Sequence, residues 1–302
     1  MNECVEPWDQ GHRGGRTRRR WSTLRQLVRS PGGIVGAAMV VVVVAVATLA
    51  PWLAPYDPQK QNITRRLRPP AWQEGGSVEN LLGTDSLGRD IYSRGIFGSR
   101  VSLAVGLAAT LLSALVGVSL GLAAGYLGKG VDTVVSRVGD VQQAIPFLVL
   151  AIAVAAMLGP GLANLILVLV VTTWVTFFRV VRGQVLSVRE EQYVWAARSI
   201  GCSSTRIMLR TILPNVMASV IVIATLLVAN MIIFEASLSF LGLGTPSSMP
   251  TWGRIVSDGR EYVSSEWWIA LFPGLAILIT VMGINLLGDA LREVLDPRQR
   301  EW

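Results

Sequence analysis

The amino-acid sequence predicts an all-α membrane protein with six transmembrane helices, and three observations support this fold class. Only 16% of the 302 residues are charged, whereas 51% are hydrophobic; a soluble domain carries about 25% charged residues. The charges are also unevenly placed, because five long windows contain no Asp, Glu, Lys or Arg: 30–56, 101–128, 141–178, 211–234 and 267–288. Such windows are typical of membrane-spanning helices, which need about 20 apolar residues to cross about 30 Å of hydrocarbon.

The window 141–178 is too long for one span. A helix of that length would extend about 57 Å at about 1.5 Å per residue, so the chain must turn inside it. Gly159-Pro160-Gly161 lies at its middle, and Pro cannot continue a helix, whereas Gly tolerates the dihedral angles of a turn. We therefore expect a helical hairpin there and six spans in all, at about 34–53, 101–127, 138–158, 162–180, 214–238 and 268–290.

The basic residues predict that both termini are cytoplasmic. Six spans place both ends of the chain on one side, together with the short connection after the second span and the connection 179–213. These segments hold 18 basic residues, whereas the two loops on the other side hold nine. The positive-inside rule therefore assigns the first group of segments to the cytoplasm and the two loops to the exterior. The expected organisation is a basic cytoplasmic tail (1–33), the first helix and an extracytoplasmic loop (34–100), a five-helix core (101–292) and a cytoplasmic C-terminal tail (293–302).

The first 33 residues are expected to include a helix that lies on the membrane surface. Trp21, Leu24 and Leu27 share one helical face and are surrounded by arginines, the pattern of an amphipathic helix on anionic lipid. A cleaved signal peptide is the alternative interpretation. Against it, the following apolar run is too long, and Pro51 follows the only small-residue site, Ala50.

Residues that carry enzyme chemistry are sparse. The single histidine, His12, lies in the Arg- and Gly-rich tail, and the two cysteines, Cys4 and Cys202, both fall on the predicted cytoplasmic side, so neither a disulfide nor a nucleophilic pair is indicated. The Gly-rich segment 125–130 lacks the residues of a phosphate-binding loop. We expect no catalytic residue, no metal and no cofactor bound by this chain. The net charge of +7 follows from the topology and requires no nucleic-acid partner.

The connection 179–213 is predicted to dock another protein. Ser187-Val188-Arg189-Glu190 matches a capping box, so a helix should begin at Val188 and end before Gly201, a residue typical of the position after a helix. A second helix should run from Ser203 to about Leu213. Pro214 would stop it and open the fifth span.

Small residues in the first of these helices would let a partner approach closely. The alternative is an interfacial loop whose arginines anchor it to lipid headgroups. A DNA-binding helix-turn-helix is a third interpretation, but both ends of this segment are tethered to the bilayer.

The same segment resembles the EAA loop of ABC importer permeases. Trp195-Ala196-Ala197, Gly201 and Leu213-Pro214-Asn215 match its pattern, except that Trp195 stands where Glu is usual. In that family the first helix of the loop sits in a groove of a cytoplasmic ATPase. The resemblance therefore implies ATPase docking through Glu190, Glu191, Tyr193, Trp195, Ala196, Ala197, Gly201, Leu213 and Pro214.

Further motifs are similar to one branch, the C-type permeases of dipeptide and oligopeptide importers. They are Leu82–Asp90, Glu235–Gly244, Pro250–Gly253, Gly288–Glu293 and Asp296–Arg298. This resemblance implies a multi-pass permease of the bacterial inner membrane that moves di- or oligopeptides by alternating access. The implied partners are a B-type permease, two ATPase subunits that bind the ATP and Mg, and an extracytoplasmic binding protein.

Two other functions remain open from the residues. A permease of the same family could carry nickel, glutathione or another small solute. An ion-coupled secondary transporter is the alternative from another class and should show ionisable groups at mid-membrane and internal repeats.

Four polar residues near the predicted spans are candidates for a gate or for bracing between helices: Glu235, Asp140, Asn285 and Asp289. Glu235 lies about 31 Å along a helix from Pro214, which places it near the outer interface. In the second span, Gly117, Gly121 and Gly125 form a small-residue face that permits close helix packing.

Overall fold

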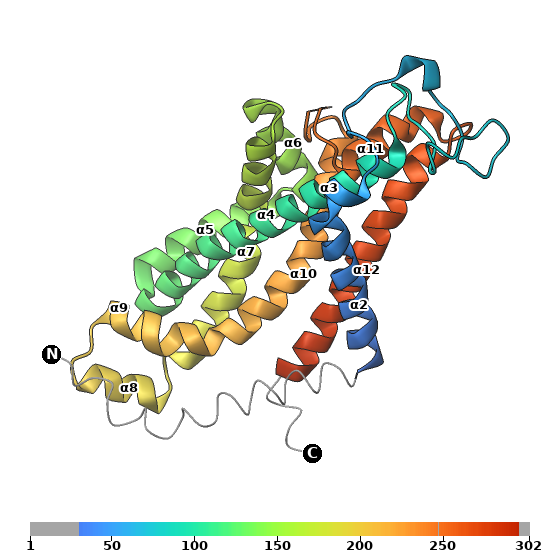
Figure 1. Cartoon of the computed structure of the whole chain (residues 1–302). Helices are drawn as coiled ribbons and strands as arrows, with labels where there is room; N and C mark the ends of the chain where they lie inside the picture. The colour runs from blue at the N-terminus through green and yellow to red at the C-terminus, as the bar shows by residue number, and fades with distance from the viewer. Residues whose placement is uncertain (1–29, 247, 296–302) are drawn as a thin grey trace.

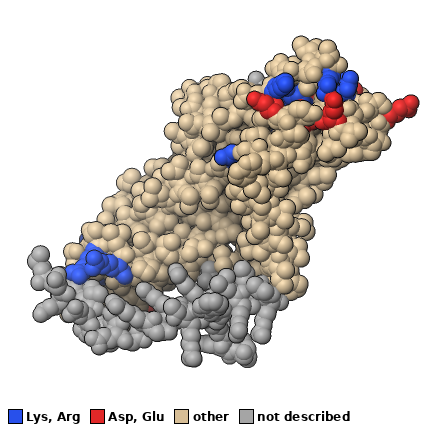
Figure 2. All heavy atoms as spheres, viewed as in Figure 1, with Lys and Arg blue, Asp and Glu red and all other residues tan. Residues whose placement is uncertain are grey.

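The computed structural model describes residues 30–246 and 248–295, which form a bundle of helices (Figure 1). Five helices are long and apolar enough to cross a membrane. They are α2 (Pro31–Thr48), α4 (Ile91–Leu127), α7 (Leu162–Val188), α10 (Leu213–Phe240) and α12 (Trp268–Leu295). In the view of Figure 2, basic side chains gather at the two ends of the bundle and acidic ones at one of them, and both kinds are almost absent from its middle. The predicted all-α membrane fold is confirmed.

The two ends of the bundle carry different elements (Figure 1). The start of α2, the end of α12 and the short helix α8 (Gln192–Ser199) lie at one end, which we call the α8 end. The other, which we call the α11 end, carries the long loop before α4 and several short helices. These are α3 (Ala50–Leu53), η1 (Ile63–Arg65), α11 (Trp252–Gly259) and η3 (Arg260–Tyr262).

The predicted third span, 138–158, is broken by a bend. The chain forms two helices there, α5 (Lys129–Ala144) and α6 (Phe147–Leu158), with a bend of 98° between them. Pro146 causes the bend, because it cannot continue a helix and forces the preceding Ile145 into an extended conformation. With 12 residues, α6 extends only about 18 Å. The predicted turn between α6 and α7 is confirmed at Gly159 and Gly161, both with positive φ.

Four of the five long helices extend beyond their charge-free windows, and α4 and α7 do so by the most residues. α4 begins at Ile91 rather than near residue 101, because Asp90 caps it by accepting a hydrogen bond from the backbone N–H of Ser93 (2.8 Å). α7 continues past residue 180 to Val188, since Val185 at its end is buried in the core. Charges at helix ends do not stop a helix, so counting charge-free residues underestimates its length.

The core of the bundle is the contact between α4 and α7. A Cβ atom added at Gly117 would lie 2.4 Å from the carbonyl oxygen of Trp174, and one added at Gly125 would lie 2.7 Å from Cβ of Val185. The small-residue face predicted on the second span therefore packs within this chain. Around this contact, buried residues from α4, α7, α8 and α10 form one apolar cluster, which includes Leu122, Phe177, Val181, Val185, Val194 and Val216.

Candidate functional site

α8 lies at the end of the bundle with most of its side chains exposed. The side chains of Tyr193 and Trp195 are 45% and 51% exposed, and Glu190, Glu191 and Ala196 are also exposed. Val194 alone is buried in α8, where it packs into the apolar cluster beside α7 and α10. Val194, with the partly buried Ala197, thus attaches the helix to the bundle, and the exposed side chains of α8 are left open to a partner.

Two arginines add polar attachments between this region and the end of α4. Arg189 donates a hydrogen bond from Nη1 to the carbonyl oxygen of Gly125 (2.8 Å). The guanidinium of Arg198 lies 4.9 Å from the ring centroid of Tyr126 and 5.2 Å from that of Trp195, distances typical of cation–π contacts. Trp195, which stands where the EAA pattern has Glu, therefore helps to hold Arg198 between two rings.

Gly201 ends α8 in the conformation predicted for it. Its φ is +79°, its N–H donates to the carbonyl of Arg198 (3.0 Å), and the N–H of Cys202 donates to the carbonyl of Ala197 (3.1 Å). This pair of bonds is a Schellman motif, which satisfies the last carbonyls of the helix and turns the chain back toward the bundle.

The predicted capping box is wrong. Ser187 lies inside α7, which continues to Val188, and α8 begins only at Gln192. The short break between them is closed by bonds from the N–H groups of Glu190 and Glu191 to the carbonyls of Ser187 and Val188. The pattern failed because packing of α7 in the core overrides a local capping preference.

The second predicted helix of the connection is not separate from the fifth span. α9 (Ser204–Arg206) and the π-helical turn η2 (Ile207–Ile212) run directly into α10. Pro214 does not stop the helix, because it lies in the first turn of α10, directly after the π turn, where a proline is tolerated. Leu213 packs against the apolar cluster and Pro214 is exposed, so Leu213 lies apart from the exposed surface of α8.

Tyr193 is held in its neutral form on this surface. Burial of its hydroxyl group raises the pKa of Tyr193, and the nearby Glu191 carboxylate raises it further. The tyrosine therefore presents a hydrogen-bonding phenol, and the charge on this side of α8 comes from the carboxylates.

Glu235 is fully buried and joins three helices. Its carboxylate accepts hydrogen bonds from the hydroxyls of Ser239 on α10 (2.7 Å) and Ser102 on α4 (3.3 Å). Thr251, the N-cap of α11, also bonds to it. Ser102 in turn accepts from the backbone N–H of Trp252 (3.1 Å). This geometry suits bracing between helices at the α11 end, and the bracing role stays a prediction.

Replacing Glu235 with Leu should lower the free energy of unfolding by about 1–3 kcal/mol, because it leaves buried hydroxyl groups without their acceptor. Thermal unfolding of the purified protein in detergent measures the effect. Ser237→Ala is the matched control, since Ser237 lies on the same helix and donates only to the carbonyl of Ile233. Equal melting temperatures for the two variants would contradict the bracing role.

The other three polar candidates lie near the surface. Asp140 on α5 pairs with Arg179 on α7 (2.8 Å), and both side chains are about half exposed. Asn285 is partly buried and Asp289 is exposed on α12. The structure therefore separates these residues from Glu235, and their roles stay predictions. No group of three His, Cys, Asp or Glu side chains within the described ranges is placed to hold a metal ion.

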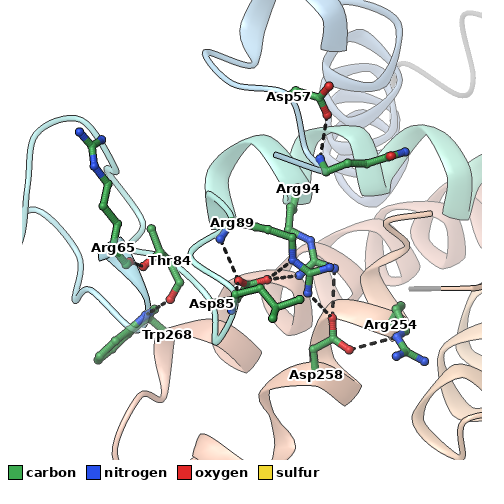
Figure 3. Close-up of polar contacts among 11 residues, drawn as sticks. Asp57, Arg65, Thr84, Asp85, Arg89, Arg94, Arg254, Asp258 and Trp268 are labelled. Atoms are coloured by element: carbon green, nitrogen blue, oxygen red, sulfur yellow. Dashed lines mark hydrogen bonds and ion pairs between the residues drawn. The ribbon is translucent and has the colours of Figure 1, made fainter. Parts of the chain in front are cut away.

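A buried ion-pair cluster at the α11 end was not predicted from the sequence (Figure 3). Asp85, in the loop before α4, pairs with Arg89 Nε (2.6 Å) and with Arg94. Asp258, on α11, pairs with Arg89 Nη2 (3.0 Å), Arg94 Nη2 (3.1 Å) and Arg254 Nε (3.0 Å). Asp85 and Arg94 are each 1% exposed. The cluster fixes the loop to α11 across the first turns of α4.

Comparison with known proteins identifies the family. Residues 117–301 match the family described as the binding-protein-dependent transport system inner membrane component. The chain belongs to this family. Residues 20–70 of the permease also match the N-terminal transmembrane domain of oligopeptide transport permease C. The family expected from the EAA-like loop and the C-type motifs is therefore confirmed, and the alternative of a secondary transporter has no support.

Relatives cover nearly the whole permease. It is 44% identical over 273 residues to the dipeptide transport system permease protein of Escherichia coli K12, covering 90% of this chain and 91% of that protein. It is 40% identical over 274 residues to the di/tripeptide transport system permease protein of Pseudomonas aeruginosa UCBPP-PA14, covering 91% and 90%.

A solved structure shares the fold. A chain of the MetNI methionine ABC transporter, in inward-facing conformations, superposes with a TM-score of 0.54 at 19% identity. The superposition covers 67% of the permease and 96% of that chain. At this identity the likeness concerns the fold of the transmembrane bundle.

Proposed function

We propose that the permease moves di- or oligopeptides into the cell as one transmembrane subunit of an ATP-driven importer. The observation that carries the proposal is α8, a helix attached to the bundle through Val194 and Arg198, with most of its other side chains exposed. A partner that moves α8 would act on the bundle through Val194, which lies in the apolar cluster that also holds side chains of α7, η2 and α10. The peptide cargo is supported by the relatives named as dipeptide and di/tripeptide permeases.

The proposal includes partners and an orientation. The partners are a second, B-type permease, two ATPase subunits that dock at α8, and a binding protein that delivers solute at the α11 end. The α8 end and both termini face the cytoplasm, since the predicted cytoplasmic segments hold 18 basic residues against nine. Hydrolysis takes place in the ATPase subunits, and this chain supplies the passage.

Uptake by the complete transporter in proteoliposomes tests this function. We expect ATP-dependent accumulation of a radiolabelled dipeptide that requires both the binding protein and this chain. Nickel and glutathione serve as the competing cargoes. ATP-dependent uptake of either one, without dipeptide uptake, would assign the permease to the other cargo class.

A further inference from the structure

The exposed residues of α5 fall on two chemically different flanks. One flank is apolar and carries Val131, Val134, Val138 and Val141, which are 41–67% exposed. The other is polar and carries Lys129, Thr133, Arg137, Asp140 and Gln143, all exposed. Between these flanks the helix packs on α7, where Gly139 meets Val175 and Gln142 donates to the carbonyl oxygen of Thr172 (3.0 Å). Lipid suits the valine flank and does not suit the polar one.

The polar flank continues onto α7 through an ion pair. Arg179 Nη2 lies 2.8 Å from Asp140 Oδ1, and the two side chains are 49% and 54% exposed. Thr176, Gly183 and Ser187 are also exposed and lie three or four residues apart along the same face as Arg179. A Cβ atom added at Gly183 would meet nothing within 4 Å, so the space beside this face is open.

The same surface extends to α10. Gln184 on α7 donates a hydrogen bond to the hydroxyl of Ser219 on α10, which places Ser219 on the flank of α10 that adjoins α7. Asn230 is exposed and lies about three helical turns further along the same flank. We define the polar face as these exposed residues of three adjoining helices: Thr133, Arg137, Asp140, Gln143, Thr176, Arg179, Gly183, Ser187 and Asn230.

The ion pair of this face lies beside charge-free stretches of the neighbouring helices. A Cβ atom added at Gly121 of α4 would lie 2.9 Å from the carbonyl oxygen of Phe178. Gly121 therefore lies at the same height along the bundle as Phe178, the residue before Arg179. From Gly121, α4 remains free of charge to its end at Leu127, about 9 Å further along. α10 is likewise free of charge from its start to Phe234. The pair is therefore half exposed beside stretches of α4 and α10 that carry no charge.

The remaining outer surface of the bundle differs from the polar face. The large exposed side chains in the middle of α2, α4 and α12 are apolar and suit lipid; they include Val41, Val42, Leu107, Leu111, Leu115, Leu275, Leu278 and Met282. Ionisable residues at membrane depth face a water-filled cavity or another protein chain rather than hydrocarbon.

We propose that the polar face of α5, α7 and α10 lines the water-filled path through which solute crosses the assembled transporter. The inference rests on the proposed function and adds to it the residues that line the passage. The face carries both Asp140 and Arg179, so it offers a partner to each end of a zwitterionic solute such as a peptide. The valine flank of α5 faces lipid.

Accessibility of single cysteines in the assembled transporter tests the proposal. The background is the chain with Cys4→Ser and Cys202→Ser. In it, Gln143→Cys and Thr176→Cys report on the polar face, and Val138→Cys and Val141→Cys are matched controls on the valine flank. The probe is a charged, membrane-impermeant methanethiosulfonate, which reacts with the thiolate that forms in water. We expect the polar-face variants to react at least about tenfold faster than the controls.

Equal, slow reaction at all four positions in the assembled transporter would overturn the proposal. Slow reaction at the polar face in the complex, with fast reaction in the purified chain alone, would also overturn it and assign this face to the contact with the second permease. The labelling pattern does not depend on the cargo. If it is as expected and dipeptide uptake fails, the failure concerns the proposed cargo and the path assignment is retained.

Discussion

Replacing Asp85 with Asn is expected to destabilise the permease by about 3–5 kcal/mol, the cost of leaving buried charges without their counter-charge. Asp85 faces the guanidinium groups of Arg89 and Arg94, and these three side chains are 6% exposed or less. Asn keeps the shape of the side chain and can still accept from the backbone N–H of Leu87 (2.9 Å). The change therefore removes mainly the charge, and the buried cluster of two aspartates and three arginines becomes more positive.

An exposed ion pair in the same loop provides the control. Arg65 and Glu79 form a salt bridge whose side chains are 33% and 54% exposed, and such surface pairs contribute about 0–1 kcal/mol. Glu79→Gln should leave the melting temperature of the purified protein in detergent almost unchanged, whereas Asp85→Asn should lower it by several degrees. If both variants have the same melting temperature as the unmodified protein, the cluster does not stabilise the α11 end.

This cluster illustrates what sequence reasoning could not supply. Asp85 and Arg89 lie in a motif that the sequence marks as typical of the family, but their partner Asp258 lies far along the chain on α11. The two segments meet only when α4, α11 and α12 pack together. A polar residue in a loop gives no local signal of a buried partner, so the motif could be identified and its structural role could not.

The long helices were predictable because each depends on a local property of the sequence. A window of about 20 apolar residues without charge forms a span wherever it occurs, and α2, α4, α7, α10 and α12 follow that rule. The helix ends depend instead on packing and on specific bonds. Pro146 bends the third span even though no charge interrupts the window, and the π turn before Pro214 continues a helix that the proline was expected to stop.

The short exposed helix of the connection 179–213 was predicted in its position and partly in its details, and its docking role stays a prediction. The connection does place a short exposed helix with Gly201 after its end, as the C-cap pattern indicated. The predicted start of that helix was wrong, and so was the prediction of a separate second helix. Burial of Val194 and the contacts of Arg198 with two aromatic rings depend on where α4 ends relative to α8, which no pattern within residues 179–213 contains.

Replacing Gly201 with Val is expected to lower uptake at least about tenfold and to reduce the amount of ATPase that co-purifies with the permease. At φ +79° an L-residue pays about 1–2 kcal/mol, and a β-branched side chain fits this conformation worst. Because about 1.4 kcal/mol changes an equilibrium tenfold, this strain suffices to shift the population away from the Schellman turn. Without that turn, α8 loses its fixed direction relative to α10.

Gly130→Val separates this strain from the effect of added bulk. A Cβ atom at Gly130 or at Gly201 would meet nothing within 4 Å, so neither substitution creates a clash, but Gly130 lies in the helical conformation of α5. We expect Gly130→Val to retain normal uptake and normal ATPase binding, and both variants to remain in the membrane fraction. A normal amount of ATPase on the Gly201→Val permease would show that the partner does not depend on the geometry of α8, and the ATPase would then have to attach elsewhere on the chain.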